Sequence, residues 1–220
     1  MRVPSCSSLG SCRSGVLFRA LLLSLCLSGW VRADVTISPW IPIFKGVDRA
    51  TAKMTPINGD PELQAVNVVR VDLTDPDVQL LSTPRYTNYL AGTRETAAQT
   101  VSSFLQQNQL QVAVNANFYS PVDSVGAGGA LKVIGLHISK GLVVSPQDNA
   151  QDSAAVLFTT NNHVSFVFTN YPPTNTTGIY TAVSGHYPLV IAGQNVANDN
   201  ASPIPGLQPR TALGASKDGR

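Results

Sequence analysis

Residues 154–169 contain an apolar run, Ala154-Ala-Val-Leu-Phe-Thr159, a turn signal, Asn161-Asn162, and a second apolar run, His163-Val-Ser-Phe-Val-Phe-Thr169. β-Branched and aromatic residues suit a pleated, half-buried surface, and consecutive asparagines favour a tight turn. This stretch therefore predicts two adjacent strands joined by a short turn.

The same pattern recurs on both sides of this pair of strands. Residues 35–44 are apolar but carry Pro39 and Pro42, which suits an edge strand or an extended segment. Short strands at this spacing with few helices predict an α+β fold, a single domain dominated by a mixed or antiparallel sheet. The other expected strands are residues 65–73, 78–81, 111–114, 132–139, 181–184, 189–192 and 211–216.

One helix, packed on the sheet, is expected over residues 93–109. Thr93 is a plausible N-cap and Glu95 would lie in the first turn. From Ala97 the apolar residues recur at i, i+4, i+7 and i+8, which places them on one face.

The first 33 residues have the order of a secretory signal peptide: basic residues, an apolar run, and Val31-Arg32-Ala33. Cleavage is expected after Ala33, with an uncleaved anchor as the alternative, although the apolar run is shorter than the roughly 20 residues that span a bilayer. All three cysteines lie in this leader, so residues 34–220 can form no disulfide and offer no thiolate. Without the leader's four arginines, 11 basic residues face 13 acidic ones, so a net charge of +2 becomes −2. No basic stripe or membrane-surface helix remains, which argues against nucleic acid and, after cleavage, membrane as partners. We expect a secreted or extracytoplasmic protein, of undetermined oligomeric state.

Polar and aromatic side chains follow directly on the expected strand 111–114. Asn115, Asn117, Phe118 and Tyr119 fall within five residues. Amides both donate and accept hydrogen bonds and flat rings cover apolar faces, as sugar recognition requires. The alternative is a strand capped by an asparagine-rich turn.

Two later clusters also suggest a ligand. Gly185 lies between apolar strand residues, where a bare backbone lets a ligand approach closely; a β-bulge glycine is the alternative. Arg210 immediately precedes an apolar run, and an arginine there can bind phosphate or carboxylate through two hydrogen bonds; an internal salt bridge is the alternative.

Several familiar catalytic patterns are missing. His137, His163 and His186 are far apart in sequence, and no HExxH, paired cysteines or calcium loop occurs, so no metal and no other cofactor is expected. Neither a Gly-x-Ser-x-Gly elbow nor a phosphate-binding loop is present.

Taken in order, four motifs resemble the phosphodiester glycosidase family. They are Asn115-Ala-Asn-Phe-Tyr119, Ile134-Gly-Leu-His-Ile-Ser-Lys-Gly141, Ser184-Gly-His-Tyr-Pro-Leu-Val190 and Arg210-Thr-Ala-Leu-Gly-Ala-Ser-Lys-Asp-Gly219. The resemblance spans about residues 35–220. It implies an α+β domain that hydrolyses a sugar–phosphate diester, releasing the sugar and leaving a phosphomonoester. The positions it implies as lining or shaping the pocket are Asn115, Asn117, Phe118, Gly135, Gly185, Arg210 and Thr211.

The resemblance also implies a later Asp-Gly-Gly-Gly-Ser-type motif, which does not occur within the 220 residues. Together with half a hairpin turn at residues 217–220, this leads us to expect a C-terminally incomplete domain, inactive if the later aspartate is catalytic.

Glycoside cleavage usually takes two carboxylates. A phosphomonoester is already a good leaving group, so neutralising its charge matters more than strong acid assistance, and Arg210 is the candidate for that role. Asp123 and Asp199 are the candidate carboxylates, with Tyr119 beside Phe118 for ring packing. Two other functions remain open: a non-catalytic secreted carbohydrate-binding domain, and a structural β-domain without a ligand.

Overall fold

The computed structural model describes residues 35–54, 64–121, 125–146, 154–168, 175–197 and 210–217. The chain divides into two compact units, one of residues 1–38 with 51–67 and one of residues 39–50 with 68–220. Within the described residues, no helix has the length and apolar character needed to cross a membrane. The candidate signal peptide, residues 1–33, lies outside the described part.

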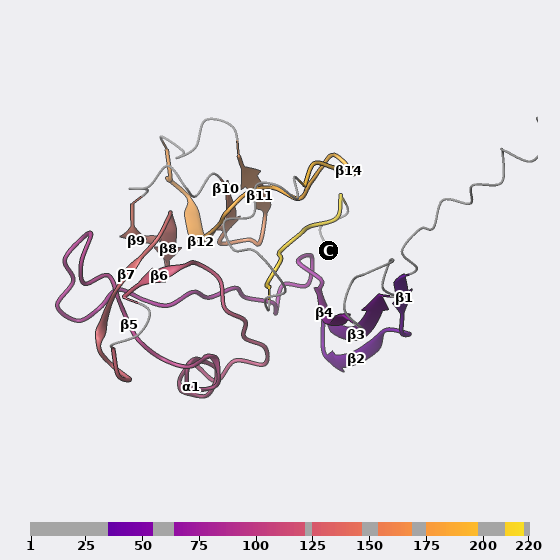
Figure 1. Cartoon of the computed structure of the whole chain (residues 1–220), viewed down its shortest axis with the longest axis horizontal. Coiled ribbons are helices and arrows are strands. Elements are labelled where there is room, and N and C mark those ends of the chain that lie inside the picture. Colours follow the sequence, from indigo (N-terminus) through magenta and orange to yellow (C-terminus); the bar gives the residue numbers. More distant parts are fainter. Residues whose placement is uncertain are drawn as a thin grey trace, which may run out of the picture. The chain divides into compact units, whose positions relative to one another are not determined.

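The larger unit is built on a five-stranded sheet in which every described pairing is antiparallel (Figure 1). Its described residues are mostly β with one helix, which is compatible with the predicted α+β class. The hairpin predicted at residues 154–169 is present, because Ala155 pairs with Val167 and Phe158 with Val164. In spatial order the strands are β11 (Val164–Val167), β10 (Ala154–Thr159), β12 (Ile179–Gly185), β8 (His137–Ser139) and β9 (Leu142–Ser145).

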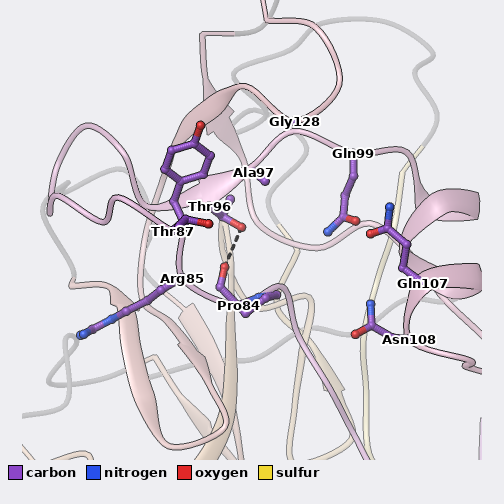
Figure 2. A pocket seen from close by; sticks show the side chains of 10 residues that line it. Pro84, Arg85, Thr87, Thr96, Ala97, Gln99, Gln107, Asn108 and Gly128 are labelled. Carbon is purple, nitrogen blue, oxygen red and sulfur yellow. Dashed lines mark hydrogen bonds between the residues drawn. The ribbon is translucent and has the colours of Figure 1, made fainter.

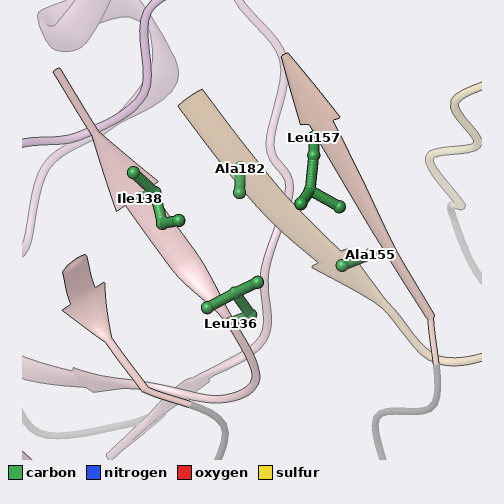
Figure 3. Close-up of a cluster of buried hydrophobic side chains, with 5 residues drawn as sticks. All are labelled: Leu136, Ile138, Ala155, Leu157 and Ala182. Atoms are coloured by element: carbon green, nitrogen blue, oxygen red, sulfur yellow. The ribbon is translucent and has the colours of Figure 1, made fainter. Parts of the chain in front are cut away.

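The hydrophobic core lies on one face of the three middle strands. Figure 3 shows small and branched side chains of β8, β12 and β10 meeting there. Burial of these apolar side chains is the main stabilising contribution, at roughly 25 cal/mol per Å² of surface removed from water. The cluster consists of Leu136, Ile138, Ala155, Leu157 and Ala182.

Tight turns set the register of two hairpins. Lys140 and Gly141, between β8 and β9, have φ of 50° and 77°. Ala192 and Gly193, between β13 (Val190–Ile191) and β14 (Gln194–Asn195), have φ of 50° and 78°. Positive φ at both central residues is the type I′ arrangement, whose twist matches that of the flanking strands.

A second sheet of three short strands carries the asparagine-rich segment. Its order is β5 (Thr96–Ala97), β7 (Ala130–Val133) and β6 (Tyr119–Ser120). Tyr119 pairs with Val133, and the strand predicted at residues 132–139 is divided into β7 and β8 at Gly135. Gly135 has φ of 82°, a left-handed conformation that favours glycine.

The predicted helix is wrong in its first half. The helix α1 is Val101–Gln107, and its N-cap is Thr100, whose hydroxyl accepts the Ser103 N–H at 3.1 Å. Residues 93–98 instead form a turn and β5, where the buried Glu95 and Thr96 hydrogen-bond to distant backbone. These long-range bonds outweigh a helical periodicity that is only a weak preference.

Three strand predictions are also wrong. Residues 111–114 and 211–216 form no strand, and Val114 is 60% exposed. Residues 78–81 have no backbone ladder either. Side chains hold them in place, because Asn162 Nδ2 donates to the Val78 carbonyl at 2.7 Å and Thr181 Oγ1 to that of Leu80 at 3.1 Å.

The N-terminal strands confirm the extended character of residues 35–44 and 65–73. β1 (Val35–Ile37) pairs with the second half of β3 (Val47–Met54), and β2 (Ile41–Phe44) pairs with its first half. β4 (Gln64–Val71) also pairs with β3. In the larger unit, Arg70 donates to Asp48 at 2.6 Å and stacks over the Trp40 ring at 4.5 Å.

Candidate functional site

The first and last of the four motifs meet through a side-chain hydrogen bond. Thr211 Oγ1 donates to Asn115 Oδ1 at 2.7 Å, across 96 positions of the sequence. Both residues are exposed, so the bond lies at the surface. It leaves the Asn115 NH2 group as a donor and the Thr211 hydroxyl oxygen as an acceptor, side by side.

Asn117 joins the first motif to the second. Its Nδ2 donates to the carbonyls of Ile134 at 3.1 Å and of Leu136 at 3.2 Å. The two carbonyls flank the left-handed Gly135, so this amide fixes the turn. The Asn117 donors are therefore occupied by backbone, and only its oxygen is left to meet a ligand.

Ser184 joins the third motif to the second. Its buried hydroxyl donates to the Leu136 carbonyl at 2.8 Å, so that one carbonyl accepts from both Ser184 and Asn117. Ser184 lies in the third motif, but this role was not predicted. The signal was available: a serine at the buried end of a strand needs a hydrogen-bond partner.

Gly185 ends β12 opposite Ala154, and the register shift of that pair lies elsewhere, between Phe158 and Thr159. The β-bulge alternative is therefore wrong. A Cβ added to Gly185 would meet no atom of the described residues within 4 Å, so none of them covers that side of its backbone.

Two aromatic side chains follow Asn117, and both are about half exposed, Phe118 at 47% and Tyr119 at 46%. The Phe118 carbonyl accepts the Ile134 N–H at 2.8 Å, so Phe118 continues the ladder of β6. Successive side chains on a strand point to opposite faces. Only one of these two rings can therefore pack on a given ligand.

The candidate charged residues are only partly placed. Arg210 is exposed and directly precedes Thr211, so its backbone lies beside the Asn115 side chain. Asp123 and Asp199 lie outside the described residues. The described acids are Asp48, Asp72, Asp75, Asp77 and Glu95, and none belongs to the four motifs.

His137 is buried in the second motif. Its side chain is 3% exposed, and neither ring nitrogen has a hydrogen-bond partner in the described part of the chain. Burial lowers its pKa from 6.5 to about 4, so the ring is neutral near pH 7. Within the described ranges, no three His, Cys, Asp or Glu side chains gather as metal ligands would.

Glu95 is a buried carboxylate whose role is structural. It is 1% exposed, and its two oxygens accept the N–H groups of Gly92 at 2.8 Å and Val133 at 2.7 Å. Val133 lies in β7 and pairs with Tyr119, so the carboxylate holds the strand on which β6 and its aromatic segment pair. Sequence reasoning missed this role because it placed Glu95 on a helix.

The four motifs are thus linked to one another through Leu136, Asn117, Asn115 and Thr211. The sequence model of the phosphodiester glycosidase family matches residues 108–220, just over half of the chain. A comparison with curated proteins finds no match to the chain. The matched residues contain all four motifs, and the chain belongs to the phosphodiester glycosidase family, whose members are glycosidase-type hydrolases acting on carbohydrate.

Proposed function

We propose that the protein hydrolyses a sugar–phosphate diester, releasing the sugar and leaving a phosphomonoester. The observation that carries this proposal is the Thr211–Asn115 hydrogen bond at 2.7 Å. It places the backbone of Arg210 beside the Asn115 amide. The Arg210 side chain is a permanent cation, and the amide suits a sugar hydroxyl. A substrate that contains both a sugar and a phosphate needs the amide and the cation close together.

The proposed reaction breaks the bond between the anomeric carbon and a phosphate oxygen. Water adds its oxygen to the anomeric carbon, its proton is released, and the phosphate keeps the bonding electron pair. Negative charge grows on the departing phosphomonoester, and a guanidinium can bind two of its oxygens. Arg210 is assigned this role.

Polar groups of two motifs, the first and the fourth, are assigned to the sugar. The Asn115 NH2 group donates to a hydroxyl, while the free oxygen of Asn117 and the Thr211 hydroxyl accept. Either Phe118 or Tyr119 packs on the apolar face of the ring. The open side of Gly185 lets the ligand approach the end of β12, and Gly135 shapes the turn.

Asp123 and Asp199 remain the proposed carboxylates, for the leaving oxygen and for the attacking water. Their separation would indicate the stereochemical outcome, because inversion leaves room for a water between them whereas retention does not.

A non-catalytic carbohydrate-binding domain is the second candidate. The observation that favours it is that the five described acids all lie outside the four motifs; Asp218, in the fourth motif, lies outside the described residues. The same donors, acceptors and rings would then bind a glycan without cleaving it.

Hydrolysis of a sugar linked through phosphate to nitrophenol or to a nucleoside separates the two candidates. The first predicts release of free sugar and a phosphomonoester. In ¹⁸O-labelled water the label should enter the sugar. Label in the phosphate would refute cleavage at the anomeric carbon, and saturable binding without release would favour the binding domain.

We also propose that the protein is exported, with residues 1–33 removed. The support is the order of basic, apolar and small residues in that segment. Mass spectrometry of protein recovered outside the cytoplasm should find Asp34 at the N-terminus. A chain that retains residues 1–33 would refute cleavage there.

A further inference from the structure

A hollow in the surface of the larger unit lies apart from the four motifs. Its volume is about 390 Å³, and the end of α1, β5 and the segment before β5 line it (Figure 2). Small-molecule sites usually occupy roughly 300–1,000 Å³. None of the described residues assigned above to the diester contributes to its lining.

Three side-chain amides enter this hollow. In Figure 2 those of Gln99 and Gln107 are turned toward one another, with that of Asn108 below them in this view. Asn108 Nδ2 donates to the Phe104 carbonyl at 2.9 Å, which holds that side chain at the end of the helix. Gln99 and Gln107 make no side-chain hydrogen bond within the described part of the chain. Each of these two glutamines offers two donors and an acceptor.

Among the described residues the lining carries no acid, and its one cation there is already engaged. Arg85 Nε donates to the Val143 carbonyl at 2.7 Å, and the guanidinium stacks over the Tyr89 ring at 4.2 Å. In Figure 2 the Arg85 side chain points away from the glutamines. A charged ligand would therefore find no opposite charge beside the amides.

We propose that this hollow is a second binding site, for an uncharged, hydroxyl-rich ligand: a neutral sugar residue. Paired amides without internal partners match vicinal hydroxyls, which both donate and accept. The inference does not depend on hydrolysis of the diester, because it concerns different residues and a ligand without phosphate.

The test is an NMR titration of the whole protein with glucose, galactose, mannose and N-acetylglucosamine. At least one of these sugars should shift the side-chain amide signals of Gln99 and Gln107. Glucose 1-phosphate should bind no more tightly than glucose. Thr211→Val should leave these shifts in place, which separates this site from the diester site.

Two near-isosteric variants and a matched control complete the test. Gln99→Leu and Gln107→Leu should each weaken binding about tenfold, as expected for the loss of one or two hydrogen bonds. Gln106→Leu, an exposed change on the same helix outside the lining, should leave the affinity unchanged. The proposal is overturned if none of the sugars shifts these amides at tens of millimolar, if Gln106→Leu weakens binding as much, or if the phosphorylated sugar binds more tightly.

Discussion

Ser184 and Asn117, which lie 67 positions apart, share one acceptor: the Leu136 carbonyl takes the serine hydroxyl at 2.8 Å and the asparagine amide at 3.2 Å. The end of β12 and the asparagine-rich segment are therefore fixed to the same atom. This bond network is internal to the larger unit, and it defines the geometry of the proposed diester site.

Ser184→Ala should lower the free energy of unfolding by about 1 kcal/mol, because one buried hydrogen bond is lost. Substrate affinity should also fall, since the end of β12 loses its link to Leu136. Ser82→Ala is the control, because Ser82 donates to the Ile138 carbonyl at 2.8 Å and is equally buried. Urea unfolding should show similar losses for both variants, and only Ser184→Ala should change affinity. Equal effects on affinity would mean that Ser184 acts on stability alone.

Gly185→Ala should leave stability unchanged or raise it slightly, because an added Cβ meets no atom of the described residues within 4 Å. If the substrate approaches this backbone, the same methyl group should reduce kcat/KM at least tenfold. Thermal unfolding and initial rates measure the two effects separately. A variant with unchanged kcat/KM would remove Gly185 from the proposed site.

Arg210→Ala should weaken anionic substrates far more than neutral sugars, by roughly 1–3 kcal/mol for a lost charge-assisted bond. Arg210→Lys keeps the charge but not the paired donors, so it should restore only part of the affinity. Isothermal titration with a sugar phosphate and with the plain sugar gives the comparison. Equal losses for both ligands would show that Arg210 is structural.

Glu95→Gln should lower the free energy of unfolding by about 3 kcal/mol. The amide keeps one acceptor but turns an NH2 group toward a backbone N–H, so a buried donor loses its partner. Asp77→Asn, at an exposed ion pair with Lys45, should change stability little. Chemical denaturation of both variants tests this, and a small loss for Glu95→Gln would contradict the assigned role.

Stability should fall on acidification because of His137. Its pKa is 6.5 when exposed and about 4 in the folded chain, so the unfolded state takes up a proton first as the pH drops. The contribution is present above about pH 6.5 and lost toward pH 4, by on the order of 3 kcal/mol at most.

His137→Leu should flatten this part of the pH dependence relative to the parent protein. Urea midpoints between about pH 4 and 7 give the comparison. An unchanged slope in His137→Leu would exclude His137 as its source.

Local patterns predicted the elements that depend on local chemistry. β10 lies at the predicted residues 154–159, and the turn predicted at Asn161-Asn162 is present. Predictions failed where hydrogen bonds to residues distant in sequence determine the backbone conformation. Residues 93–98 follow the bonds of Glu95 and Thr96 rather than their helical spacing, and an apolar run at 111–114 lies at the surface.

The order of the motifs predicted which segments would meet, and hydrogen bonds now connect them. The sequence could not reveal that the Asn117 donors are used up by backbone, because that depends on the turn at Gly135. It also gave no sign of the hollow at Gln99 and Gln107, since spacing alone does not show that the two amides face each other.

The turn at Gly135 limits which residues can be substituted independently among relatives of this protein. A side chain at 135 would strain the left-handed backbone and move both carbonyls that Asn117 holds, one of which also anchors Ser184. A change at any one of these three positions removes hydrogen bonds or the turn on which the other two depend. Among relatives, positions 117, 135 and 184 should therefore be inherited or replaced as a set, even though 67 residues separate the first from the last.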